Sequence, residues 1–426
     1  MLLKIKNFAK IQNAEVKIDG ITVIAGENNT GKSTIGKILY SMYASYYNIE
    51  EKIYSEKKDL IISKLFKYVV NLDEDLNSLN NNITLCRSIA EKIINNYENI
   101  SNINKFVSDL MSKDFKINLD DSDFDKIILD IQEVLDIKND IVEFTIVEDI
   151  FNSEFNSQIN HTNFKDKKAT VELNIKDKSL YFVFKNNEIE NIKRTINLFV
   201  NPIYIDNPFM LDELSNKKIN PFKAVHHKED FSNKLENRNS NNNLINQTLT
   251  KSRLSKIISK LNSVTNGSFS DIDGELKFNI TGLNEPLSLT NLSNGLKTFV
   301  IIKRLLENGY LEENGLLILD EPEIHLHPDW QLILAEIIVL LNEEFSINII
   351  VNTHSPYFLN AIEVFSTKYK VSNKCNYYLA ELDKDDNTVS HIADVTNETS
   401  YIYDKLASPL QKLEKLFYEI GENNEF

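Results

Sequence analysis

The chain has 426 residues and a formal net charge of −16, and only 11 residues are Gly and 8 are Pro, where average usage of these two would give about 12 %. This composition excludes collagenous and Pro-rich disordered classes, and the acidic balance argues against a surface built throughout for nucleic acid. Two cysteines, Cys86 and Cys375, are too few for a disulfide framework and are typical of a reducing cytoplasm, where we expect the protein to act.

The N-terminal region predicts strands, then a Gly-containing turn, then a helix. Residues 2–18 alternate apolar and polar side chains, as a half-buried strand or strand pair does, and residues 21–25 form an apolar run. A helical pattern over 35–42 follows the turn. The first residues contain no signal-peptide core, and the most apolar run, 332–341, is too short to span a bilayer, so we expect no membrane association.

The middle of the chain contains neither Gly nor Pro from residue 37 to 201, which favours long helices over tight hairpins. We expect a mainly helical insertion over 46–199, with a β-hairpin near 170–185. Residues 120–149 hold eleven acids and two lysines, which indicates a solvated helical face or, alternatively, a docking surface for a basic partner. Residues 217–260 hold ten basic and three acidic residues, which fits either nucleic-acid binding or a solvated linker.

The C-terminal half returns to short strands and helices. Apolar runs predict strands at 202–206, 316–319 and 347–351, and a helix is predicted over 298–306. We expect a C-terminal helix over 401–426, in which Ser408 and Pro409 are typical of a cap and first helical position. We interpret the apolar stripe of this helix as core packing rather than a partner groove, and the stripe consists of Leu410, Leu413, Phe417 and Ile420.

The segment Gly26-x-x-x-x-Gly31-Lys32-Ser33 fits the phosphate-binding loop, and it has a strand before it and a helix after it. The glycines let backbone N–H groups turn inward around phosphates, and the positive end of the helix points at them. Lys32 supplies a point charge for the β- and γ-phosphates, and the Ser33 hydroxyl is placed to ligate Mg²⁺. The loop therefore predicts binding of ATP or GTP.

The apolar strand 316–319 ends in two adjacent acids, Asp320 and Glu321. A buried parallel strand is a continuous apolar run, and ligands of such sheets lie beyond the C-terminal ends of the strands. This places Asp320 beside the metal and Glu321 within reach of an attacking water, for which a carboxylate can act as general base.

Three weaker signals lie in the same half of the chain. Ser293 and Gly295 precede a predicted helix, where they could bind an anion, although the motif alone predicts only a helix cap. His354 follows the strand 347–351, and it reaches the edge of the phosphate loop if the strands are parallel. Glu323, His325 and His327 have metal-binding side chains, but their spacing is more typical of a structural or dimer-contact segment.

Taken in order, the phosphate loop, LSNGLK (292–297), LLILDEPEIHLHP (316–328) and NTHSP (352–356) resemble the ATP-binding-cassette (ABC) class of ATPases, in its SMC-like branch with a long insertion. The sequences of these motifs are similar to those in ATPases of bacterial antiphage systems of the overcoming-lysogenization-defect, Septu and PARIS types. The resemblance covers residues 1–45 and 270–365. It implies an α/β fold, with an ABC-type P-loop NTPase head of mixed sheet built from 1–45 and 200–400.

The resemblance also implies a role for each residue of the motifs. Asp320 holds Mg²⁺ with Ser33, Glu321 activates water, and His354 contacts the γ-phosphate. Ser293 and Gly295 meet the γ-phosphate on a second chain, so that two chains enclose two ATP molecules. Asn294, Leu296 and Lys297 depart from the pattern of transporters. The loop residues expected to contact ATP are Gly26, Asn28, Asn29, Thr30, Gly31, Lys32, Ser33 and Thr34.

The chain ends 70 residues after NTHSP, so we expect no appended nuclease domain. We hypothesise an ATPase that forms a homodimer or higher homo-oligomer around ATP and senses infection or regulates a separate nuclease or toxin in antiphage defence. An SMC-like DNA-repair ATPase is the alternative, and it predicts a long coiled-coil insertion. A transporter nucleotide-binding subunit would have a shorter insertion, and an ATP-dependent scaffold would show negligible turnover.

Overall fold

The computed structural model describes residues 1–69, 76–96, 103–114, 121–164, 166–216, 226–239, 244–272 and 275–423. The chain divides into two compact units. The first unit contains Met1–Tyr47 and the described residues from Ile150 onward, and the second contains the described residues between 48 and 149.

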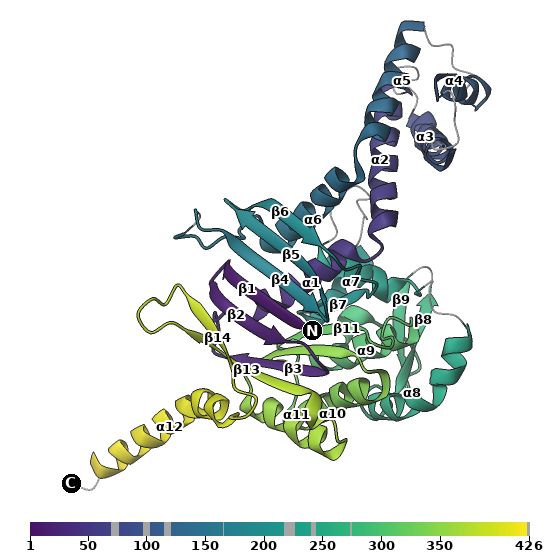
Figure 1. Cartoon of the computed structure of the whole chain (residues 1–426). Helices are drawn as coiled ribbons and strands as arrows, with labels where there is room; N and C mark the ends of the chain where they lie inside the picture. Colours follow the sequence, from purple (N-terminus) through teal and green to yellow (C-terminus); the bar gives the residue numbers. More distant parts are fainter. Residues whose placement is uncertain are drawn as a thin grey trace. The chain divides into compact units, whose positions relative to one another are not determined.

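The first unit is built on an 11-stranded sheet in the order β6-β5-β4-β1-β2-β14-β13-β3-β12-β11-β7 (Figure 1). Parallel and antiparallel neighbours both occur, and helices pack on the sheet, so the predicted α/β class with a mixed sheet is confirmed. A separate three-stranded sheet has the order β10-β9-β8. The strands are β1 (Leu2–Phe8), β2 (Ile11–Lys17), β3 (Ile21–Gly26), β4 (Ala169–Ile175), β5 (Lys178–Lys185), β6 (Glu188–Arg194), β7 (Pro202–Ile205), β8 (Gly267–Ile272), β9 (Glu275–Ile280), β10 (Leu287–Ser288), β11 (Leu316–Asp320), β12 (Asn348–Thr353), β13 (Cys375–Leu382) and β14 (Ser390–Asp394).

Helices cover both faces of the parallel part of the sheet, which is why its strands are apolar on both sides. Leu317 and Leu319 belong to one core together with α9, α10 and α11. Ile318 points to the opposite face, where α1 packs so closely that a Cβ on Gly36 would lie 2.9 Å from its side chain. The helices of this unit are α1 (Lys32–Tyr46), α7 (His227–Glu236), α8 (Leu244–Val264), α9 (Asn294–Glu307), α10 (Pro328–Phe345), α11 (Pro356–Lys368) and α12 (Ser400–Asn423), with short 3-10 helices η3 (Pro208–Asn216), η4 (Leu289–Asn291) and η5 (Ser372–Lys374).

The predicted hairpin near 170–185 is present as β4 and β5, but it does not belong to the helical insertion. β4 pairs with β1, so β4, β5 and β6 extend the sheet of the first unit, called the head unit below, to which residues 150–199 belong. A third strand, β6, follows β5 through Asn186 and Asn187, both of which have positive φ, as a two-residue hairpin turn requires. The insertion was expected to end at residue 199, but the second unit ends at Asp149. The reason is that strand pairing places the residues after it in the sheet of the first unit.

The second unit is a helical bundle with its own apolar core, in which α2 packs against α3 and α5. Its longest helices have 21 residues, which corresponds to about 32 Å. The described residues therefore contain no long coiled coil in this unit. The described part of the acidic stretch 120–149 lies in α5 and α6. One of its acids, Asp130, forms an ion pair with Lys64 at 2.9 Å. The helices are α2 (Ile49–Val69), α3 (Leu76–Asn96), α4 (Ile103–Asp114), α5 (Asp121–Asp136) and α6 (Asn139–Phe155), of which α6 runs on into the first unit.

The basic stretch 217–260 lies partly outside the described residues, which leave out 217–225 and 240–243. In the described part, four basic side chains pair with carboxylates and so do not form a free cationic patch. Lys234 is buried against Asp230, while Arg253, Lys256 and Lys260 pair with Glu313, Glu344 and Glu336.

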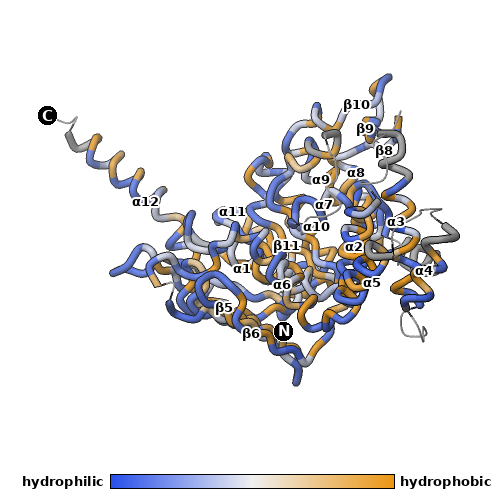
Figure 2. The backbone as a smooth tube through the Cα atoms, turned by 90° about the horizontal axis from the view of Figure 1, so that it is seen from above, coloured by the Kyte–Doolittle hydropathy of each residue, from blue (hydrophilic) through white to orange (hydrophobic). Residues whose placement is uncertain are grey.

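The C-terminal helix α12 begins at Ser400, next to the expected start at residue 401, but two expectations about it were wrong. Ser408 and Pro409 are not its cap and first position, since Pro409 lies inside the helix and Ile402, Tyr403 and Leu406 already pack on the core. The predicted apolar stripe does not pack on the core: Leu410, Leu413 and Ile420 are exposed, and Phe417 is 77 % exposed. Figure 2 shows these apolar bands recurring along the helix.

None of the helices in the described part of the chain combines the length and the apolar character needed to span a bilayer.

The buried carboxylate of Glu336 joins the helices α8, α10 and α11, which share one core on the same face of the sheet. Glu336 of α10 accepts hydrogen bonds from Lys260 of α8 (2.6 Å), Lys368 of α11 (2.7 Å) and the Tyr369 hydroxyl (2.6 Å). Burial alone would raise the pKa of Glu336, but the two ammonium groups and the hydroxyl lower this pKa to about 2.

This lowered pKa predicts how stability depends on pH. The stabilisation by Glu336 is complete above its unfolded-state pKa and is lost as pH falls toward about 2. We expect Glu336→Gln to lower the free energy of unfolding by about 1–3 kcal/mol at pH 7, with the gap to wild type closing between pH 4.5 and 2. Urea unfolding across this range measures it, with the exposed Glu343→Gln on the same helix as control. A gap that stays constant with pH would contradict the assignment.

Candidate active site

The loop between β3 and α1 is shaped by residues with positive φ. Gly31, the residue before α1, has φ 86°, and Asn29 has φ 66°. The Thr30 hydroxyl is buried and donates to the Glu27 carbonyl at 2.8 Å, whereas Asn28, Asn29 and Ser33 are exposed. Ser33 is exposed in the first turn of α1, where a helix N-terminus can bind an anion, and the Thr34 N–H donates to the Gly31 carbonyl at 3.1 Å.

Lys32 lies inside this loop with only 4 % of its surface exposed. Its ammonium group donates to the carbonyls of Gly26 (2.9 Å) and Glu27 (2.8 Å) and lies 3.7 Å from a carboxylate oxygen of Glu321. Burial lowers the pKa of Lys32, and the carboxylates of Glu321 and Asp320 oppose this shift. The loop and the two acids at the end of β11, Asp320 and Glu321, are therefore in electrostatic contact.

The strands β3, β12, β11 and β7 are parallel and end at the same edge of the sheet. Asp320 is the last residue of β11 and lies opposite Asn352 in the register. Its two carboxylate oxygens accept one hydrogen bond each, from the Tyr204 hydroxyl (3.0 Å) and the Asn352 amide (2.9 Å). The condition under which the His354 prediction was made, parallel strands, is met.

Glu321 has φ 50°, an uncommon conformation for a residue with a side chain, and such strain tends to occur at functional sites. Its N–H donates to the Asn352 carbonyl at 2.9 Å, which holds this conformation. Its carboxylate lies 3.4 Å from His354 Nδ1 and 3.7 Å from the Lys32 ammonium. Three of the residues singled out in the sequence, from three separate motifs, thus meet at one point.

Glu323 lies buried beside this point, whereas His325 and His327 are exposed. It is 2 % exposed and accepts a hydrogen bond from the Thr353 hydroxyl, and burial raises the pKa of Glu323. The Thr353 hydroxyl also accepts from the Ser355 N–H at 3.0 Å. Glu323 therefore braces the segment that carries His354. His327 caps α10 by accepting from the Asp329 N–H, so the segment has the structural role that its spacing favoured.

Ser293 and Gly295 lie at the start of α9, and no hydrogen bond or ion pair joins them to the 26–34 loop within the described residues. Ser293 is exposed, whereas Gly295 packs against Trp330, whose ring would lie 3.1 Å from an added Cβ. Lys297, one of the departures from the transporter pattern, is buried and pairs with Asp212 at 2.7 Å. Its charge is thus directed into the protein and not toward a second chain.

The sequence reasoning missed four residues of this site. Tyr204 lies within the predicted strand 202–206, one residue before the end of β7, and Asn352 and Thr353 directly precede His354 in the motif NTHSP. Glu323 was considered only as a metal ligand. The signal that could have identified them is position, because polar residues at the C-terminal ends of parallel strands meet at one edge.

Comparison with known proteins identifies relatives of this chain. A family model described as "AAA ATPase domain" matches residues 1–359, which include the 26–34 loop, Asp320, Glu321 and His354. The chain is 25 % identical over 407 residues to the endonuclease GajA of Bacillus cereus (strain HuB5-5), covering 84 % of this chain and 55 % of GajA. It is 36 % identical over 103 residues to the retron Vc95 probable ATPase of Vibrio cholerae serotype O1 biovar El Tor, covering 21 % of this chain and 19 % of that protein. The chain thus spans about half of one curated relative and a fifth of the other.

Solved structures of SMC heads also align with most of the chain. An SMC head bound to the C-terminal winged-helix domain of ScpA aligns with 94 % of this chain and 98 % of its own length, at a TM-score of 0.43 and 12 % identity. The SMC head domain of Thermotoga maritima aligns with 92 % of this chain and 98 % of its own length, at a TM-score of 0.38 and 12 % identity.

The contact between Thr353 and Glu323 predicts a stability effect. Thr353→Val removes the hydroxyl that both Glu323 and the Ser355 N–H use, so buried polar groups lose their partner. We expect a loss of about 1–3 kcal/mol in the free energy of unfolding, measured by urea denaturation. Thr353→Ser keeps the hydroxyl and should lose clearly less. If the two variants are equally stable, the hydroxyl does not brace this segment.

Proposed function

The chain belongs to the AAA ATPase domain family, and we propose that it binds ATP with Mg²⁺ at the 26–34 loop and hydrolyses the ATP. One observation supports this above all. The Glu321 carboxylate directly after β11 lies 3.7 Å from the Lys32 ammonium of the loop and 3.4 Å from His354 after β12, although the three residues are far apart in sequence. A phosphate-binding lysine beside a carboxylate base is the arrangement that hydrolysis of a phosphoanhydride needs.

The residues present fit the expected cofactors. Ser33 and Asp320 would hold Mg²⁺, since the Ser33 hydroxyl is exposed at the helix N-terminus and each Asp320 oxygen keeps acceptor capacity beyond its one hydrogen bond. Backbone N–H groups of Asn28 to Thr34 would bind phosphate oxygens, with the Thr34 N–H giving up its hydrogen bond to the Gly31 carbonyl. Mg²⁺ would supply charge neutralisation of the phosphates.

Glu321 would act as the general base and take the proton of the attacking water on its carboxylate. The hydrogen bond from its N–H to Asn352 fixes the backbone, so the carboxylate is held at the strand end before substrate binds. Lys32 would exchange its two loop carbonyls for phosphate oxygens. His354 would donate to the transferred phosphoryl group, braced through Ser355 and Thr353 by Glu323.

Hydrolysis would require two copies of the chain. Ser293 is exposed at the start of α9 and is not joined to the loop of its own chain among the described residues, as expected of a group that serves a second chain. Ser293 and Gly295 of one copy would meet the γ-phosphate bound to the other. ATP would thereby hold together a homodimer, or a higher homo-oligomer.

We assign the ATPase to antiphage defence, where it would sense infection or regulate a separate effector, a nuclease or a toxin, in the cytoplasm. The support is the likeness to an endonuclease and to a retron ATPase. Both cysteines are free and buried, which is consistent with a reducing compartment. The DNA-repair alternative is less well supported, because the described helices of the second unit reach only 21 residues and the described basic residues of 217–260 noted above are paired with acids.

Glu321→Gln tests the base. The amide keeps the shape of the side chain but cannot take a proton, so we expect the rate of ATP hydrolysis to fall at least about 100-fold while ATP affinity stays within a few-fold. Phosphate release and nucleotide-binding titrations measure the two quantities. Glu343→Gln, an exposed change on α10, is the matched control. Equal rates in Glu321→Gln and wild type would refute Glu321 as base.

Ser293→Arg tests the second copy. The bulky cation would prevent approach of two chains at α9 but lies away from the loop of its own chain, so we expect ATP binding to remain and both ATP-dependent association and hydrolysis to fall. Analytical ultracentrifugation with and without ATP measures association, and Ser268→Arg, an exposed serine on β8, is the control. Unchanged association and turnover in Ser293→Arg would exclude α9 from the contact.

A further inference from the structure

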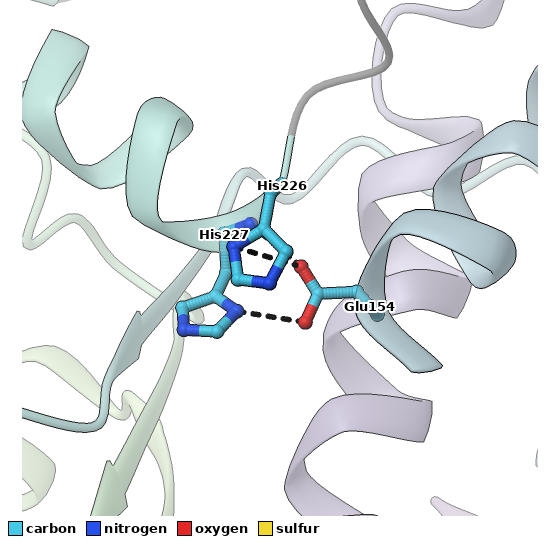
Figure 3. Close-up of side chains that lie close together, drawn as sticks. All are labelled: Glu154, His226 and His227. Carbon is cyan, nitrogen blue, oxygen red and sulfur yellow. Dashed lines mark hydrogen bonds and ion pairs between the residues drawn. The ribbon is translucent and has the colours of Figure 1, made fainter. Parts of the chain in front are cut away.

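A second polar cluster lies in the head unit outside the ATP site. Glu154 near the end of α6 meets His226 and His227 at the start of α7, and a ligand atom of each lies within 4.8 Å of the others (Figure 3). Glu154 and His227 are each only 1 % exposed, while His226 is partly exposed. Two imidazoles and a carboxylate from separate helices thus converge in a nearly dry environment.

Glu154 is directed at both histidines. One carboxylate oxygen accepts a hydrogen bond from the backbone N–H of His227 at 2.6 Å and lies 3.9 Å from His226 Nδ1. The other oxygen lies 2.7 Å from His227 Nδ1, and the centres of the two imidazole rings are 4.2 Å apart. The view in Figure 3 shows both rings facing the carboxylate, so that the nitrogens and oxygens enclose a common point.

The far side of His227 is also occupied by a carboxylate. His227 Nε2 lies 3.0 Å from an oxygen of Asp206, directly after β7. Metal-binding histidines almost always donate from their second nitrogen to such a partner. His227 Nδ1 lies 2.7 Å from Glu154, so a metal ion would take the place of the proton between this nitrogen and the carboxylate. The second oxygen of Asp206 is buried and has no hydrogen-bond partner among the described residues.

The two carboxylates of the cluster pair directly with histidines, while the ammonium groups of Lys37 and Lys228 act on Asp206 from a greater distance. In the described part of the chain, the ion pairs of Glu154 and Asp206 are with histidines alone, and neither carboxylate is paired with a lysine or arginine. Burying a carboxylate is costly unless a cation compensates its charge. A divalent cation between the histidines and Glu154 would provide that compensation.

We propose that Glu154, His226 and His227 bind a divalent transition-metal ion of the zinc type, with Asp206 orienting His227. Zinc binds imidazole and carboxylate ligands tetrahedrally at about 2.1 Å, so the ligand atoms of one ion lie about 3.4 Å apart. His226 Nδ1 lies 3.9 Å from the Glu154 oxygen, so the partly exposed His226 ring would shift by about half an ångström toward the ion. Nitrogen donors favour zinc over Mg²⁺, which sets this ion apart from the one expected at Asp320.

The ion would act on the ATP site through one aromatic ring. The Tyr204 ring lies 4.6 Å from the His227 ring, and its hydroxyl donates to Asp320. Binding a metal at His227 would thus fix the side chain that positions the carboxylate expected to hold Mg²⁺. The competing interpretation is a charged imidazole held between two carboxylates with no metal.

The test uses the full chain freed of metal with EDTA and then loaded with ZnCl₂ alone, without nucleotide. His226→Asn removes one ligand but keeps a side chain that can cap α7, as His226 does by accepting from the Lys228 N–H. His327→Asn is the matched control, because His327 caps α10 in the same way and is remote in sequence from the cluster. Zinc retained per chain after desalting and the zinc-dependent shift in Tm are measured.

We expect wild type and His327→Asn to retain one zinc more per chain than His226→Asn, and the zinc-dependent rise in Tm to be lost only in His226→Asn. The Tm of metal-free His226→Asn reports whether the variant is folded, independently of zinc. Three results would each overturn the metal site: equal zinc retention in His226→Asn and wild type, no zinc retained by any folded variant, or a loss of zinc in His327→Asn as large as in His226→Asn. Each would favour the competing interpretation, a charged imidazole between two carboxylates.

Discussion

The parallel register of β3, β12, β11 and β7 is the constraint on which the rest of the site depends. It places the ends of four strands at one edge, so that the 26–34 loop, Asp320 and Glu321, and the segment leading to His354 meet although more than 300 residues separate the first from the last. The strands can be parallel because helices cover both faces and bury their apolar runs. A shift of one residue in β11 would turn Asp320 to the opposite face of the sheet.

Buried polar contacts then determine the direction of each side chain at this edge. Tyr204 and Asn352 hold the two oxygens of Asp320, and Thr353 ties Glu323 to the segment that carries His354. In a medium of low dielectric such contacts are strong when complete and costly when broken, so they orient the acids before any ligand arrives. The same Tyr204 ring packs on His227 and links the proposed metal site to Asp320.

Much of the fold was predictable because it rests on local patterns. Alternation indicated β1 and β2, continuous apolar runs indicated β3, β11 and β12, and the Gly31-Lys32-Ser33 spacing indicated the loop. The predictions were wrong where a pattern had two physical outcomes. The stripe with Leu410 and Phe417 has the spacing of a core-facing helix but is exposed, and the hairpin expected in the insertion pairs with β1 in the head sheet. The roles assigned to Ser293 and Gly295 stay predictions.

The sequence by itself determined the chemistry of the loop and of the two acids, because short motifs specify which groups are available and at what spacing. Only the tertiary structure decided which of these groups touch. Glu321 contacts Lys32 and His354, and the buried Glu323 accepts a hydrogen bond from Thr353. Glu154 lies beside His226 and His227, which are some 70 residues away in the sequence. The physical reason is that contacts between distant segments follow from strand register and burial, which are properties of the whole packed chain and of no single window of residues.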